Sequence, residues 1–215
     1  MKNRADGDII IKRRNCHERT ICTKKLMKSL PLETKRLLVR EPELSDTDDM
    51  YAYASLPEVC RYLLWEPHIN RFQTEGYIES LQKRCRRGLY CDWTVAKKSD
   101  GRMIGTCGFA YIDSENEWCE IGYVLAPWEQ GKGYMTEALS AVTALAFETL
   151  GLCEARLRII AENIPSRRLA ERVGYGLERV CENEMEIKGV LRSIAHYRLT
   201  REQYLAAHSA DGTGR

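Results

Sequence analysis

The spacing of apolar residues divides the chain from residue 35 onward into short strands and longer helices. Residues 36–40 place Leu-Leu-Val between two arginines and predict a short strand. Ser45 or Asp46 can cap a helix that Pro57 would end, because proline cannot continue a helix interior. Residues 74–87 carry apolar side chains at helical spacing and close on several cations, so a second helix is predicted there.

The middle of the chain changes to the pattern of strands. Three strand-like segments, 92–97, 103–111 and 117–125, are separated by turn-forming residues at hairpin lengths, which predicts an antiparallel meander. Residues 135–146 then show apolar spacing of three and four. This spacing predicts a helix that packs one face on the sheet and is ended by Gly151.

Strands and helices continue to alternate after that helix. A strand is predicted at 156–161, and a helix begins with Asn163 as its N-cap and ends near Gly174. Two further strands are predicted around 175–181 and 193–199. Together with the meander, this order predicts an α+β fold with a mixed, mostly antiparallel sheet flanked by helices.

Composition limits the class of protein. The 215 residues carry a net charge of only +2 and no apolar run as long as a membrane span, so we expect one domain over residues 31–207 and no membrane partner. Residues 1–30 are rich in lysine and arginine and are expected to form a poorly ordered leader, and residues 208–215 a flexible tail. A nucleic-acid-binding arm is the less favoured interpretation of the leader, because it lacks interleaved aromatic residues.

Cysteines and histidines give no sign of secretion or of a metal site. The cysteines number nine and none forms a C-x-x-C pair, which favours free thiols in a reducing compartment. The four histidines are scattered and share no ligand-like spacing with cysteines. We therefore expect a cytoplasmic protein without a bound metal.

A glycine-rich turn at residues 130–135 stands directly before the long predicted helix. Gly131 and Gly133 let the backbone approach an anion closely, and the first turn of a helix offers unpaired N–H groups to it. The turn is not a Walker loop, because Tyr134 follows the last glycine where Lys-Ser or Lys-Thr is needed. It is not a dinucleotide fingerprint either, because Thr136 stands where the third glycine is needed. A phosphate-bearing ligand is favoured over a glycine turn without a ligand.

The same turn resembles the pyrophosphate loop of the GNAT acetyltransferase superfamily, (Q/R)-x-x-G-x-(G/A), with Gln130 and Gly133 in register. Met135 stands where the superfamily has Gly or Ala, and we expect its side chain to crowd the turn slightly. Further segments are similar to the RimJ/RimL-type branch of ribosomal-protein alanine N-acetyltransferases and follow the same order along the chain: residues 34–40, 120–123, 163–166, 171–175 and 197–202.

The resemblance implies acetyl-CoA as the co-substrate, with no metal. A backbone N–H near Leu125 would stabilise the oxyanion that forms during transfer. The residues that the resemblance assigns to binding acetyl-CoA lie on the strand before the turn, in the turn and at the start of a later helix: Val124, Leu125, Gln130, Gly131, Lys132, Gly133, Tyr134, Met135, Asn163 and Ser166.

Two side chains are expected to take part in the chemistry. Glu120 lies on the strand that leads to the turn and, as the resemblance implies, would accept the amine's proton directly or through water; a solvated strand face is the alternative. Many superfamily members protonate the thiolate with a tyrosine seven positions after the asparagine, but here that position is Ala170. Ser166 matches the serine of the RimJ/RimL branch and would hold or protonate the sulfur, or else only satisfy its own helix.

The expected enzyme is an N-acetyltransferase acting on a primary amine by direct attack in a ternary complex. At pH 7 a lysine side chain costs about 4.6 kcal/mol to deprotonate, and an α-amine costs about 1 kcal/mol. One carboxylate base therefore favours a peptide or protein N-terminal α-amine. The alternatives are a small amine, such as an antibiotic, an amino-acid analogue or a polyamine, and a domain that binds acetyl-CoA without turnover. The sequence leaves the oligomeric state open, a homodimer included.

Overall fold

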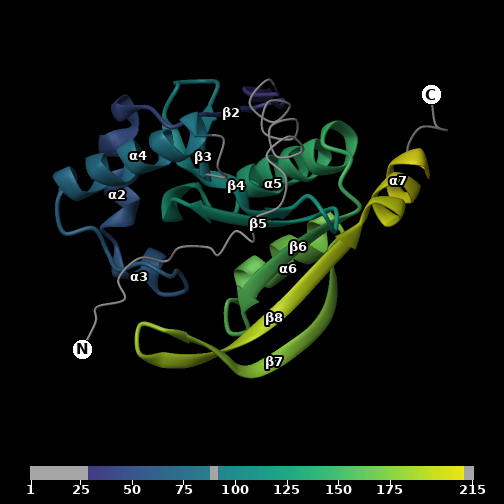
Figure 1. Ribbon diagram of the computed structural model, residues 1–215. Helices are drawn as coiled ribbons and strands as arrows, with labels where there is room; N and C mark the ends of the chain where they lie inside the picture. The colour runs from purple at the N-terminus through teal and green to yellow at the C-terminus, as the bar shows by residue number, and fades with distance from the viewer. Residues whose placement is uncertain (1–28, 88–91, 211–215) are drawn as a thin grey trace.

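The computed structural model describes residues 29–87 and 92–210, which form one mixed sheet with helices packed around it (Figure 1). Of the predicted leader, only residues 29 and 30 are described, and of the predicted tail, only residues 208–210. The rest of both segments lies outside the described residues. No helix in the described ranges combines the length and the apolar character needed to cross a bilayer.

The sheet has eight strands in the order β1-β2-β3-β4-β5-β6-β8-β7. Neighbouring strands are antiparallel except β5 and β6, which run parallel. The predicted α+β fold with a mixed, mostly antiparallel sheet is therefore confirmed. The strands are β1 (Leu32–Glu33), β2 (Leu37–Arg40), β3 (Asp92–Lys97), β4 (Met103–Asp113), β5 (Trp118–Leu125), β6 (Glu154–Ile160), β7 (Gly176–Ile187) and β8 (Val190–Thr200).

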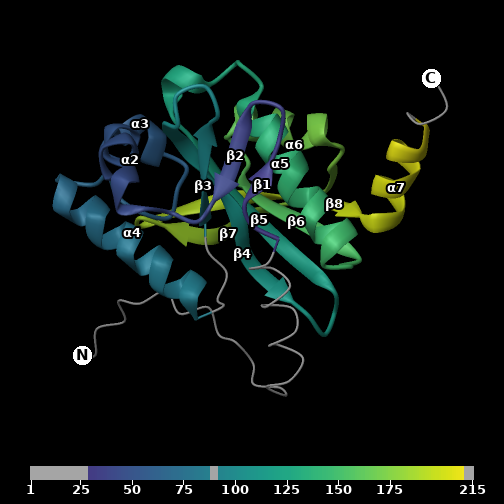
Figure 2. The ribbon, with the colours of Figure 1, turned by 90° about the horizontal axis from the view of Figure 1, so that it is seen from above.

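Helices connect the strands and pack around the sheet. The long helix predicted after the glycine turn is present and continues into a short π-helical turn, Leu145–Thr149. Seen from above, α2, α3 and α4 gather at one end of the molecule, and α5 and α6 lie together beside the other strands (Figure 2). The helices are α2 (Thr47–Ala54), α3 (Pro57–Cys60), α4 (Arg71–Arg86), α5 (Tyr134–Ala144), α6 (Ile164–Val173) and α7 (Arg201–Ala210).

Helices α2 and α6 cover opposite faces of the sheet. Thr106 of β4 and Val124 of β5 share a small internal cavity with Tyr53 of α2. The neighbouring Tyr123 of β5 instead contacts α6, where its hydroxyl lies 2.8 Å from Oγ of Ser166. Because successive side chains of a strand point to opposite faces, these contacts place α2 and α6 on opposite sides of β5.

Two predicted helix boundaries are wrong. Helix α2 ends at Ala54, and Pro57 begins α3 instead of ending a helix, because the first helical turn does not need the N–H that proline lacks. Helix α4 begins at Arg71 and not at residue 74. Its N-cap is Asn70, whose side-chain oxygen accepts a hydrogen bond from the Gln73 N–H at 2.9 Å.

The last two strands are longer than predicted. Strand β7 runs to Ile187 and β8 begins at Val190, and both turn residues between them, Lys188 and Gly189, have positive φ. Most side chains of β7 are exposed, so its sequence lacks the apolar alternation that marks a half-buried strand. The hairpin tip reaches α3, where Lys188 Nζ donates to the carbonyl of Cys60 at 2.6 Å.

Most of the described cysteines are free thiols, as expected, but Cys85 is disulfide-bonded. The prediction of free thiols is therefore wrong for Cys85. The described cysteines that form no disulfide are Cys60, Cys107, Cys119, Cys153 and Cys181.

Candidate active site

The two parallel strands at the centre of the sheet separate partway along their length. Strand β5 pairs with β6 only from Trp118 to Glu120. Beyond that point β5 continues along β4 to Leu125, and β6 continues along β8 to Ile160. Beyond Glu120, each of the two strands therefore has an edge of backbone that faces the gap between them and is not paired with the other strand.

The backbone N–H of Leu125 faces this open edge. The N–H of Ala126 donates to the carbonyl of Ile104 at 2.8 Å, which makes these two residues a hydrogen-bonded pair of the antiparallel ladder. Alternation along the ladder then turns the N–H groups of Leu125 and Tyr123 away from β4, and that of Val124 toward it. The N–H of Leu125 is therefore turned toward the gap between β5 and β6 and that of Val124 is not, although Val124 lines the cavity described next. The oxyanion role of Leu125 stays a prediction.

A cavity of about 270 Å³ lies at this separation. Its walls come from the segment after α3, from β3, β4 and β5, from β6 with the start of α6, and from the part of the β7–β8 hairpin near its tip. It brings together four of the predicted site residues, Glu120, Val124, Asn163 and Ser166. The glycine turn at 130–135 does not line it, so the predicted site consists of two regions joined through the end of β5.

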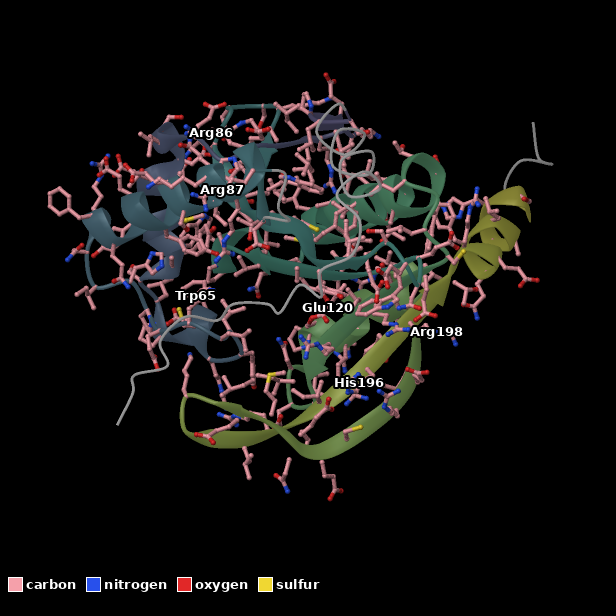
Figure 3. The ribbon with its side chains drawn as sticks, in the orientation of Figure 1. Trp65, Arg86, Arg87, Glu120, His196 and Arg198 are labelled. Atoms are coloured by element: carbon pink, nitrogen blue, oxygen red, sulfur yellow. The ribbon has the colours of Figure 1, made fainter. Side chains whose placement is uncertain are left out.

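Glu120 lines the cavity and does not lie on a solvated strand face. Its side chain is 16% exposed, and its Oε2 accepts a hydrogen bond from Nε of Arg158 on β6 at 2.8 Å. The ion pair holds the carboxylate at the point where β5 and β6 separate. Figure 3 shows Glu120 between the part of the molecule that carries Trp65 and the strand that carries His196.

Asn163 and Ser166 form the start of α6. Asn163 is the N-cap, and its Oδ1 accepts a hydrogen bond from the Ser166 N–H at 3.3 Å. The predicted N-cap role of Asn163 is therefore confirmed. The side chain of Ser166 does not serve its own helix alone, because its Oγ lies 2.8 Å from the hydroxyl of Tyr123 on β5.

Tyr123 is a site residue that sequence reasoning missed. Its hydroxyl contacts Ser166, and burial raises its pKa above the ordinary value of a tyrosine, so the hydroxyl stays protonated at neutral pH. Ala170, the position of the family's tyrosine, is 0% exposed and packs in the core. The phenol near the start of α6 thus comes from β5, and its only sequence signal was its place in the segment 120–123.

The glycine turn has the geometry of an anion site. Gly131 and Gly133 have φ of 75° and 79°, a region that other residues rarely adopt, and Gly133 is the N-cap of α5. The first N–H groups of the helix therefore have no intrahelical acceptor. The Met135 side chain is 5% exposed and packs in the core, so the predicted crowding of the turn is wrong.

Arg36 contacts the turn from outside it. Arg36 of the segment before β2 donates to the Lys132 carbonyl at 2.9 Å and pairs with Glu137 of α5 at 2.6 Å. Its guanidinium also lies over the Tyr134 ring, 4.5 Å from the centroid. Within the turn, the Lys132 ammonium lies 2.9 Å from a carboxylate oxygen of Glu129, so its charge is already paired inside the protein. Arg36 was not predicted as a site residue.

The cavity contains a second carboxylate that sequence reasoning also missed. Asp92 is the first residue of β3, and its Oδ2 accepts a hydrogen bond from the hydroxyl of Tyr77 on α4 at 3.3 Å. Burial raises the pKa of Asp92, although the hydrogen bond from Tyr77 and the charge of Arg84 act in the opposite direction.

Strand pairing also gathers one group of metal-type ligands in the described part of the chain. The ligand atoms of Cys181, Glu184 and His196 lie within 4.8 Å of one another, and His196 Nε2 is 2.5 Å from a Glu184 oxygen. This group could not be recognised from the sequence, because Cys181 and His196 come together only through the pairing of β7 with β8. The absence of a bound metal stays a prediction.

Comparison with known proteins agrees with the geometry. A family model described as an acetyltransferase (GNAT) domain matches residues 36–176. The uncharacterized N-acetyltransferase p20 of Bacillus licheniformis is 31% identical over 173 residues, which cover 80% of this chain and 97% of that protein.

Solved structures share the fold at lower identity. The ribosomal L7/L12 alpha-N-protein acetyltransferase RimL superimposes with a TM-score of 0.70 at 18% identity, covering 79% of this chain and 93% of its own. A spermidine N-acetyltransferase from Vibrio cholerae, solved with CoA and spermine, gives 0.68 at 21% identity, covering 80% and 99%. With the family match over residues 36–176 and the 31% identical relative, these findings show that the chain belongs to the GNAT family of N-acetyltransferases.

Proposed function

We propose that this acetyltransferase moves an acetyl group from acetyl-CoA to a primary amine, and that its preferred acceptor is a peptide or protein N-terminal α-amine. The observation that carries the proposal is one cavity that holds Glu120 together with the Ser166–Tyr123 pair, where β5 and β6 separate. Acyl transfer from a thioester to an amine needs a proton acceptor on the amine side and a proton donor on the sulfur side. Glu120 and Tyr123 point to opposite faces of β5 and fit these two roles.

The donor site is assigned mainly to backbone groups. The turn at Gly131 and Gly133, with the free N–H groups that begin α5, suits the pyrophosphate of CoA. The open edge of β5 and Asn163 suit the pantetheine arm that must reach the cavity. The Vibrio cholerae relative in fold holds CoA, which supports a CoA thioester as donor here.

The residues of the cavity then act in a fixed order. Glu120 accepts one proton of the acceptor amine, directly or through water, and the neutral amine attacks the thioester carbonyl in a ternary complex. The N–H of Leu125 donates a hydrogen bond to the oxyanion. When the carbon–sulfur bond breaks, Ser166 gives its proton to the thiolate and takes one from Tyr123. The attacking nitrogen, positive after the attack, releases its second proton to solvent to leave the neutral amide, and the proton held by Glu120 returns through solvent to the tyrosine.

An α-amine fits a single weak base better than a lysine side chain, because its deprotonation at pH 7 costs about 3.6 kcal/mol less. RimL, which shares the fold, is named for acetylating an alpha-amine of ribosomal L7/L12.

A small amine is the second candidate acceptor. The observation that favours it is the contact between Lys188 and the Cys60 carbonyl, which joins the hairpin tip to α3 beside the cavity and limits the bulk of an acceptor there.

The proposal is tested by incubating the full chain with acetyl-CoA and a panel of N-terminal peptides, polyamines and amino-acid analogues, with mass spectrometry locating the acetyl group. We expect acetylation of peptide α-amines and none of lysine side chains in peptides with blocked N-termini. Transfer confined to polyamines or analogues would replace the first acceptor class by the second. Binding of acetyl-CoA without any product would instead indicate a domain that binds acetyl-CoA and does not turn it over.

A further inference from the structure

Asp92 is a carboxylate of the cavity to which the proposed steps give no task. It begins β3 and lies opposite Gly108 of β4, which in turn lies opposite Gly122 of β5. The three residues form one row across the sheet. Neither glycine places a side chain on the floor of the cavity, so the aspartate can reach over the row toward β5.

The distance from Gly122 shows where the Asp92 carboxylate lies relative to β5. A Cβ built on Gly122 would lie 3.9 Å from Oδ1 of Asp92 and 3.9 Å from Cβ of Ala110. One oxygen of Asp92 therefore stands just above Gly122. Glu120, two residues earlier on β5, points to the same face of the sheet, and both carboxylates line the one cavity. The space above Gly122 is thus flanked by two carboxylates.

Asp92 has few partners for a desolvated carboxylate. Among the described residues, its hydrogen-bond partner is the Tyr77 hydroxyl at 3.3 Å, although a carboxylate has room for about four donors. Tyr53 of α2 lies close enough for the charge of Asp92 to act on it, and its buried hydroxyl has no hydrogen-bond partner in the described ranges. The charged and titratable groups that act on or near Asp92 from the packed elements are Tyr77 and Arg84 of α4, Tyr53 of α2, Cys107 of β4 and Glu120 of β5.

An ammonium group would complete this arrangement. It carries three donors and a positive charge, whereas the half-buried Asp92 accepts one hydrogen bond from Tyr77 and forms no ion pair within the described ranges. Trp65 forms part of the same cavity wall and offers an aromatic surface that favours a cation. Glu120 is already paired with Arg158, so Asp92 is the carboxylate of the cavity with the larger unmet need for a donor.

We propose that Asp92 binds the ammonium form of the acceptor above Gly122 and presents it to Glu120 and the thioester. This rests on the proposed function. The acceptor arrives as R–NH3+, one N–H bond breaks as its proton passes to Glu120, and Asp92 keeps a hydrogen bond to an N–H that remains. The acceptor class that follows is a primary amine that is charged at neutral pH, with no anionic group beside the amine.

The test compares a charged and a neutral acceptor in an Asp92→Asn variant of the full chain. The charged acceptor is the best peptide amine of the wild type, and the neutral one is the corresponding acyl hydrazide, whose terminal nitrogen is uncharged at pH 7. We expect the KM of the peptide amine to rise about 10- to 100-fold, the size of a lost charge-assisted hydrogen bond. The KM values of the hydrazide and of acetyl-CoA are expected to change less than about threefold.

A purely structural role for Asp92 would raise the KM of the amine and the hydrazide alike, and that result would overturn the proposal, as would an unchanged KM for the amine. If Asp92→Asn fails to fold, Gly122→Ala tests the same space, because its methyl group would make only ordinary contact with Asp92 and Ala110. We expect that variant to raise the acceptor KM and to keep the KM of acetyl-CoA; an unchanged acceptor KM would overturn the proposal. A wild type that acetylates no amine would contradict the proposed function instead.

Discussion

The donor half of the site uses mainly backbone groups, whereas the acceptor half uses side chains. On the donor side, the assigned groups are mainly backbone groups of the turn at 130–135 and of Leu125. On the acceptor side they are side chains from separate elements, namely Glu120 of β5, Asp92 of β3 and Trp65 after α3. A backbone site needs only glycines before a helix, so it leaves a short motif. A side-chain site depends on which residues the strand register brings together, so no single short stretch of the sequence contains it.

Substitution of Glu120 should give the largest effect, and it tests the acceptor half. We expect Glu120→Gln to lower kcat for a peptide amine by about 100-fold or more at neutral pH, the usual size for a lost general base. The loss should shrink as pH rises, because more of the amine is then neutral without help. Steady-state rates across pH measure this. Glu182→Gln, on the exposed part of β7, is the matched control. Full activity of Glu120→Gln at all pH values would remove Glu120 as the base.

The Ser166–Tyr123 pair tests whether the sulfur is protonated from β5. Ser166→Ala should lower kcat by about 30-fold and Tyr123→Phe by about 10-fold, with the KM of acetyl-CoA little changed. The double variant should be no slower than Ser166→Ala, because both residues act through one hydrogen bond. Since burial raises the pKa of Tyr123, the wild type should show no alkaline loss of kcat from this group below about pH 10. Multiplying effects in the double variant would show that the two hydroxyls act separately.

Gly133→Ala tests the donor half. The φ of 79° at Gly133 disfavours a side chain, and a Cβ would lie 3.4 Å from a guanidinium nitrogen of Arg36. We expect the KM of acetyl-CoA to rise about 10-fold while the amine KM stays the same. Gly101→Ala is the matched control, because Gly101 has a φ of 74° and no atom near the added Cβ. Equal effects of the two variants would mean that strain alone, and no anion contact, explains the loss.

Removal of metal ions should have the smallest effect. Treatment with a chelator is expected to leave acetyl transfer within about twofold of the untreated rate, because no step assigned to the cavity uses Cys181, Glu184 or His196. The rate before and after dialysis against the chelator is the measurement. A loss that zinc restores, and that His196→Ala reproduces, would show that the hairpin holds a metal that the reaction needs.

The donor half could be predicted from the sequence because it is local. The turn at 130–135, the following helix and the Asn163 cap were all placed correctly by glycines, apolar spacing and a capping residue. Met135 was the exception, since whether its side chain faces the turn or the core depends on how α5 packs on the sheet.

In the acceptor half, Glu120 was named through the resemblance, but Asp92 was not predicted, nor was Tyr123, for two physical reasons. Asp92 reaches the site through a row of three strands, and a bulge between Phe109 and Tyr111 sets which residues of β5 face it. Tyr123 reaches Ser166 across two elements that are far apart in sequence. The two strands of the β7–β8 hairpin were predicted, but the part near its tip, which supplies one wall, was missed because the exposed side chains of β7 carry no apolar alternation.

The division into two halves is tested most directly by the two KM values of Gly133→Ala and Gly122→Ala, measured beside the wild type with both substrates varied. The predicted result is a crossed pattern, in which Gly133→Ala raises only the KM of acetyl-CoA and Gly122→Ala raises only that of the acceptor amine. If both variants raise both values to the same extent, the donor and acceptor groups are not separate, and the division is wrong.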